Sequence, residues 1–234
     1  MFTVLLILLA AVDVTCSLEC IAYCSLTRIP FGDDLRIRAG EYQRRVTAPT
    51  CTVDITLNFH KMQYSATFGD IASNYERISI SSGEPLEYRF SRQCSFDIDC
   101  VLRDAQKRID ELTGRPYNAV AIYEEIAPLI TSQLAGDQID CFGANSSTVT
   151  CRSGEICRII YDPRARRVTS RGCVSSILQV YFYDSPTYAS SEIKCNSGLC
   201  NIMEVYEKVK SILNKNNLVD ANGRINATAA PEDG

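Results

Sequence analysis

Twelve cysteines constrain the fold of this chain more than any other feature of its sequence. They fall into two sets of six, and each set closes with two cysteines that have four or five residues between them. Cys94 and Cys100 lead directly into an amphipathic pattern, and so do Cys195 and Cys200. In an oxidising compartment an even set of cysteines indicates a disulfide framework, whereas in the cytosol it would indicate metal or redox chemistry. The compartment therefore decides what these cysteines mean.

The first residues of the chain have the pattern of a secretory signal peptide. Residues 2–12 form an uncharged apolar run with alanines at its end, which is too short to span a bilayer. Cleavage after Ala11 keeps all twelve cysteines, whereas cleavage after Cys16 or Ser17 would leave one thiol unpaired. We therefore expect residues 1–11 to be a signal peptide and the mature protein to be secreted, extracellular and rich in disulfide bonds.

The remaining composition excludes several classes of function. The formal net charge of the chain is −4, which gives no support for binding to nucleic acid. No second apolar stretch approaches the length of a membrane span. Residues 215–234 are polar and end in acidic residues, so we expect a disordered tail. The sequence therefore predicts neither a transmembrane anchor nor a lipid anchor.

The second half of the chain has the more informative cysteine spacing. Its strand-forming runs Ile159–Tyr161 and Val168–Ser170 are separated by the turn signal Asp162-Pro163, which predicts a β-hairpin tied down at its base. Residues 177–183 are apolar and aromatic and predict the next strand. The six cysteines of this half are Cys141, Cys151, Cys157, Cys173, Cys195 and Cys200.

This half resembles a known family. Residues 148–173 read TVTCRSGEICRIIYDPRARRVTSRGC, and residues 194–201 read KCNSGLCN. The Cys151–Cys157 spacing, the Arg-Gly-Cys that ends at Cys173 and the terminal Cys-Asn pair are similar to the three-finger fold of lymphocyte-antigen and urokinase-receptor proteins, relatives of the snake three-finger toxins. The resemblance covers residues 141–201. It implies the bonds Cys141–Cys157, Cys151–Cys173 and Cys195–Cys200.

The sequence also departs from this family. The usual cysteine two or three residues after Cys141 is absent together with its partner, and so is the bond that closes the third finger. Because both members of each pair are gone together, the departure indicates lost bonds and leaves the path of the third finger open. A module of this size buries little apolar surface, so disulfides at one end would stabilise it and leave the loop tips available for binding.

Residues 12–100 predict a second disulfide-rich β domain. Apolar and polar side chains alternate over residues 53–59 and again over residues 62–68, which is typical of a hairpin with one buried face. Residues 86–90 predict a third strand. By analogy with the second half, Cys94 is expected to pair with Cys100. The four earlier cysteines, Cys16, Cys20, Cys24 and Cys51, allow three pairings, and whether this half is also a three-finger module stays open.

Helical patterns follow both sets of cysteines. Residues 101–112 repeat apolar side chains at helical spacing, and residues 118–134 do the same, although Pro128 must break or kink that helix. We expect residues 101–140 to be a helical connector and residues 202–214 a C-terminal helix. The expected fold class is α+β, with small disulfide-rich antiparallel β-sheets joined by helices.

The sequence displays no pattern of a catalytic or metal site. Its one histidine, His60, lies where the first hairpin turns, and we interpret it as a solvated turn residue. Neither a nucleophile elbow, nor a phosphate-binding glycine loop, nor a zinc-protease motif occurs in the sequence. We therefore expect a protein that is not an enzyme and that uses no cofactor or metal.

A cluster of arginines is the candidate binding site. On an otherwise acidic chain, Glu155 and Asp162 alone oppose five arginines around the predicted hairpin. The simpler interpretation is solubilising charge; the functional one is a basic tip that binds an acidic protein, glycan or lipid headgroup. The family resemblance favours the second, since the middle finger often makes such contacts. The five are Arg158, Arg164, Arg166, Arg167 and Arg171.

Two N-glycosylation sequons are present, at Asn145 and Asn226. Asn145 lies in the short loop between Cys141 and Cys151, which would face solvent if it carries a glycan. Asn226 lies in the predicted tail, where a glycan would be tolerated.

The favoured hypothesis is a secreted, non-enzymatic binding protein that modulates a receptor, channel or other surface partner through a basic hairpin tip. Its partner would be an extracellular protein or an acidic glycan. One alternative is a secreted inhibitor of a hydrolase such as a protease, which would present the edge or loop of the first hairpin. Another is a disulfide-rich structural protein of the extracellular matrix.

Overall fold

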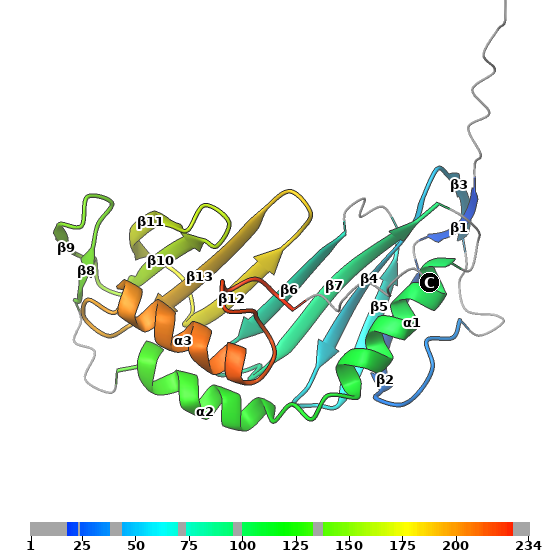
Figure 1. The fold of residues 1–234 in the computed structure, drawn as a ribbon, viewed down its shortest axis with the longest axis horizontal. Helices are drawn as coiled ribbons and strands as arrows, with labels where there is room; N and C mark the ends of the chain where they lie inside the picture. Colours follow the sequence, from blue (N-terminus) through cyan, green and yellow to red (C-terminus); the bar gives the residue numbers. More distant parts are fainter. Residues whose placement is uncertain are drawn as a thin grey trace, which may run out of the picture.

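In a computed structural model, the strands of both halves join into one antiparallel sheet of nine strands, with three helices on one of its faces (Figure 1). The structure describes residues 18–22, 24–37, 44–69, 74–95, 100–132 and 138–226. The predicted signal peptide, residues 1–11, and Cys16 lie outside these ranges.

The elements follow a simple spatial order. Across the large sheet the strands are β11 (Arg167–Val174), β10 (Ile156–Asp162), β13 (Ala189–Cys195), β12 (Gln179–Asp184), β6 (Tyr75–Ile80), β7 (Glu87–Cys94), β4 (Cys51–Asn58), β5 (Gln63–Phe68) and β2 (Cys24–Pro30). Two small sheets pair β1 (Leu18–Ala22) with β3 (Arg44–Ala48), and β8 (Asp140–Phe142) with β9 (Thr148–Thr150). The helices are α1 (Cys100–Thr113), α2 (Ala119–Ile130) and α3 (Met203–Lys215).

The two halves of the sheet repeat one arrangement. In the first half the order is β5-β4-β7-β6, and in the second half it is β11-β10-β13-β12. Each half therefore contains two hairpins, with the first strand of one beside the last strand of the other, and the first half adds β2 at the edge beside β5. Cys51 lies opposite Cys94 in one half, and Cys157 lies opposite Cys195 in the other. The repeat extends beyond the two closing cysteines that the sequence displays.

The halves meet where β6 pairs with β12, in a register that places Ile78 opposite Phe182. The expected small sheets are therefore parts of one continuous sheet, and the helices cover its face instead of forming a connector between two sheets. The physical reason is that β6 and β12 each end their own half with an unpaired edge, and pairing the two edges satisfies both rows of backbone groups.

The alternation predicted for the first hairpin is the one observed. Val53, Ile55 and Leu57 of β4 have no exposed surface and face the helices together with Tyr64, Ala66 and Phe68 of β5. The polar residues between them lie on the opposite face. There Asp54 is also buried, because it accepts hydrogen bonds from Arg89 at 2.5 Å and from Tyr75. His60 lies in the β4–β5 turn and is exposed.

Helix α1 packs on β4 and β7 through the apolar stripe that its sequence predicts, with Val101, Ala105, Ile109 and Leu112 buried. Pro128 lies inside α2, which ends two residues later at Ile130 instead of reaching residue 134. Helix α3 covers the second half, where Tyr206 packs against Tyr161 and Phe182. The helix pattern therefore predicted the elements well and their ends less well.

The segment after α3 corrects the prediction of a disordered tail. Residues 216–226 turn back over the centre of the sheet, where Leu218, Val219 and Ile225 are buried; the segment is red in Figure 1. Gly223 makes the closest approach, with a φ of +84° and a position at which a Cβ atom would come within 2.5 Å of the Tyr206 hydroxyl. These three buried residues anchor the segment together with the ion pair between Arg224 and Asp184. Residues 227–234 lie outside the described ranges.

Among the described residues, five disulfides are formed. The first half contains Cys20–Cys51 and Cys94–Cys100, and the former settles a pairing that the sequence left open. The second half contains Cys141–Cys157, Cys151–Cys173 and Cys195–Cys200, the same pairs that the family resemblance implies. Cys24 is buried.

Candidate binding surface

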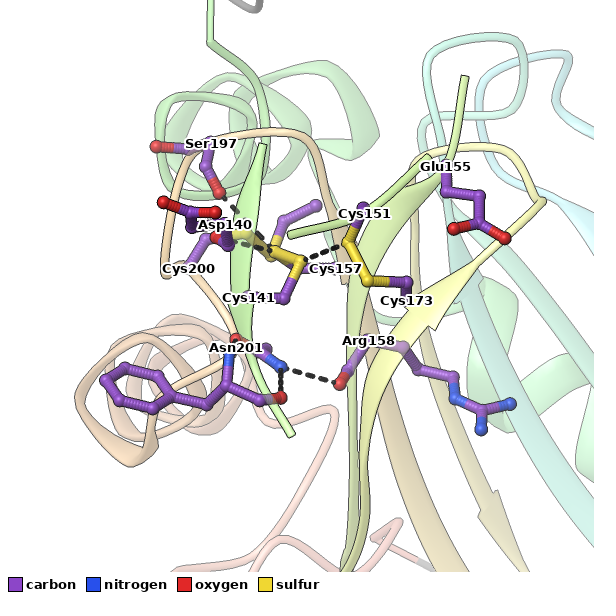
Figure 2. Close-up of a disulfide and its surroundings, with 12 residues drawn as sticks. Asp140, Cys141, Cys151, Glu155, Cys157, Arg158, Cys173, Ser197, Cys200 and Asn201 are labelled. Carbon is purple, nitrogen blue, oxygen red and sulfur yellow. Dashed lines mark hydrogen bonds between the residues drawn. A yellow bond between two sulfur atoms is a disulfide. The ribbon is translucent and has the colours of Figure 1, made fainter. Parts of the chain in front are cut away.

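The β10–β11 hairpin has its disulfides at one end and its turn at the other. Cys157 lies opposite Cys173 at the base, and Asp162 lies opposite Arg167 beside the turn. At the base, the Sγ atoms of Cys141 and Cys151 are 3.0 Å apart, so two disulfides are in contact (Figure 2). The turn is therefore the free end of a hairpin whose base is covalently fixed.

Asn201 holds the base together without a covalent bond. Its side chain accepts a hydrogen bond from the backbone N–H of Phe142 at 2.9 Å, and donates to the carbonyls of Phe142 at 2.8 Å and Arg158 at 3.1 Å (Figure 2). Asn201 has no exposed surface. A single carboxamide thus links β8 to β10 directly after the Cys195–Cys200 bond.

The sulfur atoms of Cys141, Cys151 and Cys173 lie within 4.8 Å of one another, as the donors of a metal site would. All three are consumed in disulfides. A cysteine binds metal as a thiolate, so this cluster is structural while its bonds are intact.

The sheet separates the five arginines that the sequence groups together. Arg158 lies in β10, where its side chain donates to the Ser170 hydroxyl at 3.3 Å and its Nε is 4.0 Å from Glu192. Arg171 lies in β11 opposite Ile159, whose side chain is buried beneath the helices. These two arginines therefore belong to the body of the sheet and do not extend the tip.

The turn itself is rigid. The Asp162 carboxylate accepts hydrogen bonds from the backbone N–H groups of Arg164 at 2.8 Å and Ala165 at 3.0 Å, which is the local geometry that Asp favours in turns. Pro163 is buried, and Arg166 adopts a left-handed backbone conformation with a φ of +52°. Asp162, which the sequence presents as an opposing charge, is therefore the residue that shapes the tip.

Arg164 is held by the neighbouring β12–β13 turn. Its guanidinium donates to the carbonyl of Pro186 at 2.9 Å, to the carbonyl of Ser185, and to Asp184 at 3.5 Å. The sequence contains the signal of this second turn, Asp-Ser-Pro, but gives no indication that it meets the first. Arg164 therefore joins two hairpins and is not free to bind a partner.

Arg166 and Arg167 remain available at the tip. Both side chains are exposed, and no ion pair is found for either one among residues 18–226 where these are described. Arg166 makes one long hydrogen bond, 3.4 Å, to the Asn222 side chain of the C-terminal segment. Of the five predicted residues, only Arg166 and Arg167 thus have guanidinium groups available for binding, and they are adjacent on a turn held by hydrogen bonds.

The two sequons lie in different surroundings. Asn145 is exposed in the tight turn between β8 and β9, as the loop prediction requires. Asn226 is half-buried, its side-chain nitrogen donates to the carbonyl of Asn217 at 3.1 Å, and its own carbonyl accepts from Arg108 at 3.1 Å. Asn145 is therefore the more accessible acceptor in the folded protein.

The N-terminal hairpin offers a turn but no edge. Strand β4 pairs with β5 and β7, and β5 also pairs with β2, so both strands are covered on both sides. The exposed element is the turn, in which 59 % of Met62 is accessible. An inhibitor that acts by presenting an edge of this hairpin is not consistent with that arrangement.

No known protein family model matches the chain, and no curated protein is similar to it. None of the helices in the described ranges is long and apolar enough to cross a membrane.

Proposed function

We propose that the protein is a secreted, non-enzymatic binding protein that engages an acidic extracellular partner, a protein or a glycan, through Arg166 and Arg167 at the β10–β11 turn. The observation that carries the proposal is the pair of exposed guanidiniums on a turn fixed by Asp162, at the end of the hairpin remote from its disulfides. A rigid hairpin loses little conformational entropy when its tip binds. Guanidinium is suited to carboxylate and sulfate because it donates two parallel hydrogen bonds.

Secretion is supported by the five disulfides, which persist in oxidising compartments. The proposal of a three-finger module over residues 141–201 is supported by its hairpins β8–β9, β10–β11 and β12–β13, which extend from the disulfides at their base. The third finger lacks the disulfide that closes it in the family. In its place, backbone hydrogen bonds hold β12 on both sides, to β13 and to β6. The like order of strands in the first half favours the same module there.

The test is binding of the secreted protein to immobilised heparin, a sulfated glycan, and to immobilised polyglutamate, a carboxylate polymer. Replacement of both Arg166 and Arg167 by Ser is expected to weaken binding to at least one of them by about tenfold or more, since a charge-assisted hydrogen bond contributes about 1.5–3 kcal/mol. The heparin and polyglutamate arms distinguish a glycan partner from an acidic protein.

The matched control replaces Lys107 of α1 and Arg152 by Ser. Both residues are exposed, and the change in net charge is the same as in the tip variant. If the control loses as much affinity as the tip variant, binding depends on net charge and the tip has no special role. Unchanged binding by the tip variant would also contradict the proposal.

A further inference from the structure

The seam between the two halves carries a second feature, separate from the hairpin tip. Glu76 of β6 lies directly opposite Asp184 of β12, so two carboxylates face each other across the central strand pair. Beside them is a cavity of about 530 Å³, which opens between β6, the β12–β13 turn and the C-terminal segment. Cavities of this size, between structural units, are where proteins commonly bind small molecules.

Both carboxylates already have their hydrogen bonds. Glu76 is buried and accepts from the Tyr88 hydroxyl, from Arg92 and from Arg108, the last at 2.6 Å. Asp184 accepts twice from Arg224, at 2.7 Å each, and once from Arg164. Saturated carboxylates have little capacity left for a cation, so Glu76 and Asp184 are not suited to hold a metal or an ammonium group.

Unused hydrogen-bond donors, in contrast, line the cavity. Arg224 donates from Nε and one terminal nitrogen, so its other terminal nitrogen is left; its side chain is 40 % exposed. Arg92 donates hydrogen bonds from both terminal nitrogens, so its Nε is left. The Asn74 carboxamide uses only its oxygen, which accepts from the backbone N–H of Gln93, so its nitrogen is left as well. Within the described ranges no partner is found for these three donors. A lining that has spare guanidinium and carboxamide donors, and in which the Glu76 and Asp184 carboxylates are occupied, fits a ligand that supplies acceptors.

The remaining lining is partly apolar. Ile225 and Pro186 contribute to the cavity, and so does Asp220, whose Oδ1 accepts the backbone N–H groups of Asn222 and Arg224 at 2.8 Å each and whose Oδ2 has no hydrogen-bond partner among the described residues. We propose that this cavity binds a small organic anion, a carboxylate or sulfonate group on a compact apolar body, with the anionic group between Arg92 and Arg224. The proposal is independent of the partner at the hairpin tip.

The experiment is isothermal titration of the full secreted chain with three probes. Naphthoate combines the charge with the apolar body, naphthylmethanol has the body without the charge, and acetate has the charge without the body. Naphthoate is expected to bind at least about tenfold more tightly than naphthylmethanol, the ratio that one charge-assisted hydrogen bond supplies. It is expected to bind at least about tenfold more tightly than acetate, because acetate has no apolar body to bury. Equal binding of naphthylmethanol, or no binding of naphthoate, would overturn the proposal.

Two variants locate the site. Arg224→Gln keeps a donor for Asp184 and removes the spare one, and should weaken naphthoate binding about tenfold. Asn74→Trp leaves every arginine pair intact and fills the rim of the cavity, so it should abolish binding; Lys107→Trp, on the exposed face of α1, should not change it. Thermal unfolding of each variant shows that it is folded. If naphthoate binds both cavity variants as it binds the parent, the site is elsewhere. Heparin binding should be the same in all three variants, so this test and that of the tip can fail separately.

Discussion

The Asn201 side chain makes three hydrogen bonds to backbone groups, one as acceptor and two as donor. Because Asn201 is completely buried, no water is in place to take over these bonds. Backbone groups in such surroundings are costly when they lose a partner. Asn201 is thus equivalent to a further cross-link of the disulfide base. The same principle applies to Asp162 at the tip, whose short side chain replaces backbone partners in the turn.

Replacement of Asn201 by Ala is expected to lower the free energy of unfolding by about 3 kcal/mol, because a buried N–H and two carbonyls lose their partner. Urea unfolding with the disulfides intact measures this. Gln138→Ala, at an exposed position, is the control and should change the free energy by less than about 0.5 kcal/mol. A loss at position 201 no larger than that of the control would mean that water replaces the side chain.

At the scale of elements, the C-terminal segment acts as a third layer over the seam. It lies between α3, through Gly223 and Tyr206, and α1, through the bond from Arg108 to the Asn226 carbonyl. Its amino-acid composition is typical of a tail, and only the three buried apolar residues, Leu218, Val219 and Ile225, distinguish it. Whether such residues find a buried position depends on the sheet and on α1, which lie far away in sequence, and on α3, which directly precedes the segment.

Truncation of Ile225 to Ala is therefore expected to destabilise the protein by about 2–5 kcal/mol, the range for large-to-small changes in a core. A disordered tail would show no change. The control is Ala221→Ser in the same segment, which is exposed and should be neutral. Thermal unfolding of both variants, with far-ultraviolet circular dichroism to verify the fold, decides between the two cases.

At the scale of the whole molecule, several tyrosines of the sheet are buried or half-buried beside carboxylates, and this raises the pKa of their hydroxyl groups. Burial, followed by the charges of Asp33 and Asp34, raises the pKa of Tyr64 to about 12. Burial also raises the pKa of Tyr75, which donates a hydrogen bond to Asp54, and raises that of Tyr88 beside Glu76 well above its ordinary value. The folded protein therefore holds protons that the unfolded chain releases near pH 10.

This predicts a loss of stability at alkaline pH. Since the pKa of these tyrosines is higher in the folded state, their contribution is complete below about pH 10 and is lost as the pH rises toward 12. Denaturant unfolding at increasing pH should show a falling free energy of unfolding. In Tyr64→Phe, which lacks the phenol, the decline should be less steep. Ionisation of all the tyrosines near pH 10, with no change in stability, would contradict the prediction.

Local patterns predicted a large part of this molecule. The alternation over residues 53–59 identifies β4 because one face of that strand is uniformly apolar, and the stripe of α1 is as clear. Strand β6 was missed because Glu76 interrupts its buried face. That carboxylate is accommodated by hydrogen bonds from Tyr88, from Arg92 and from Arg108, the last 32 residues away on α1. Strand β13 was missed because its buried residues include Ala189, Ser190 and Ser191, which carry no strand signal.

The sequence by itself determined the central hairpins and the main helices, because short-range periodicity acts within neighbouring residues. Its resemblance to a known family implied the three disulfides of the second half, but the pairing of Cys20 with Cys51 stayed open. Only the tertiary structure decided that β6 pairs with β12, that residues 216–226 are ordered, and which arginines are free. These outcomes depend on partners distant in the chain. Arg164 and Arg167 are the same residue type three positions apart, and the β12–β13 turn alone gives one of them a partner while the other remains exposed.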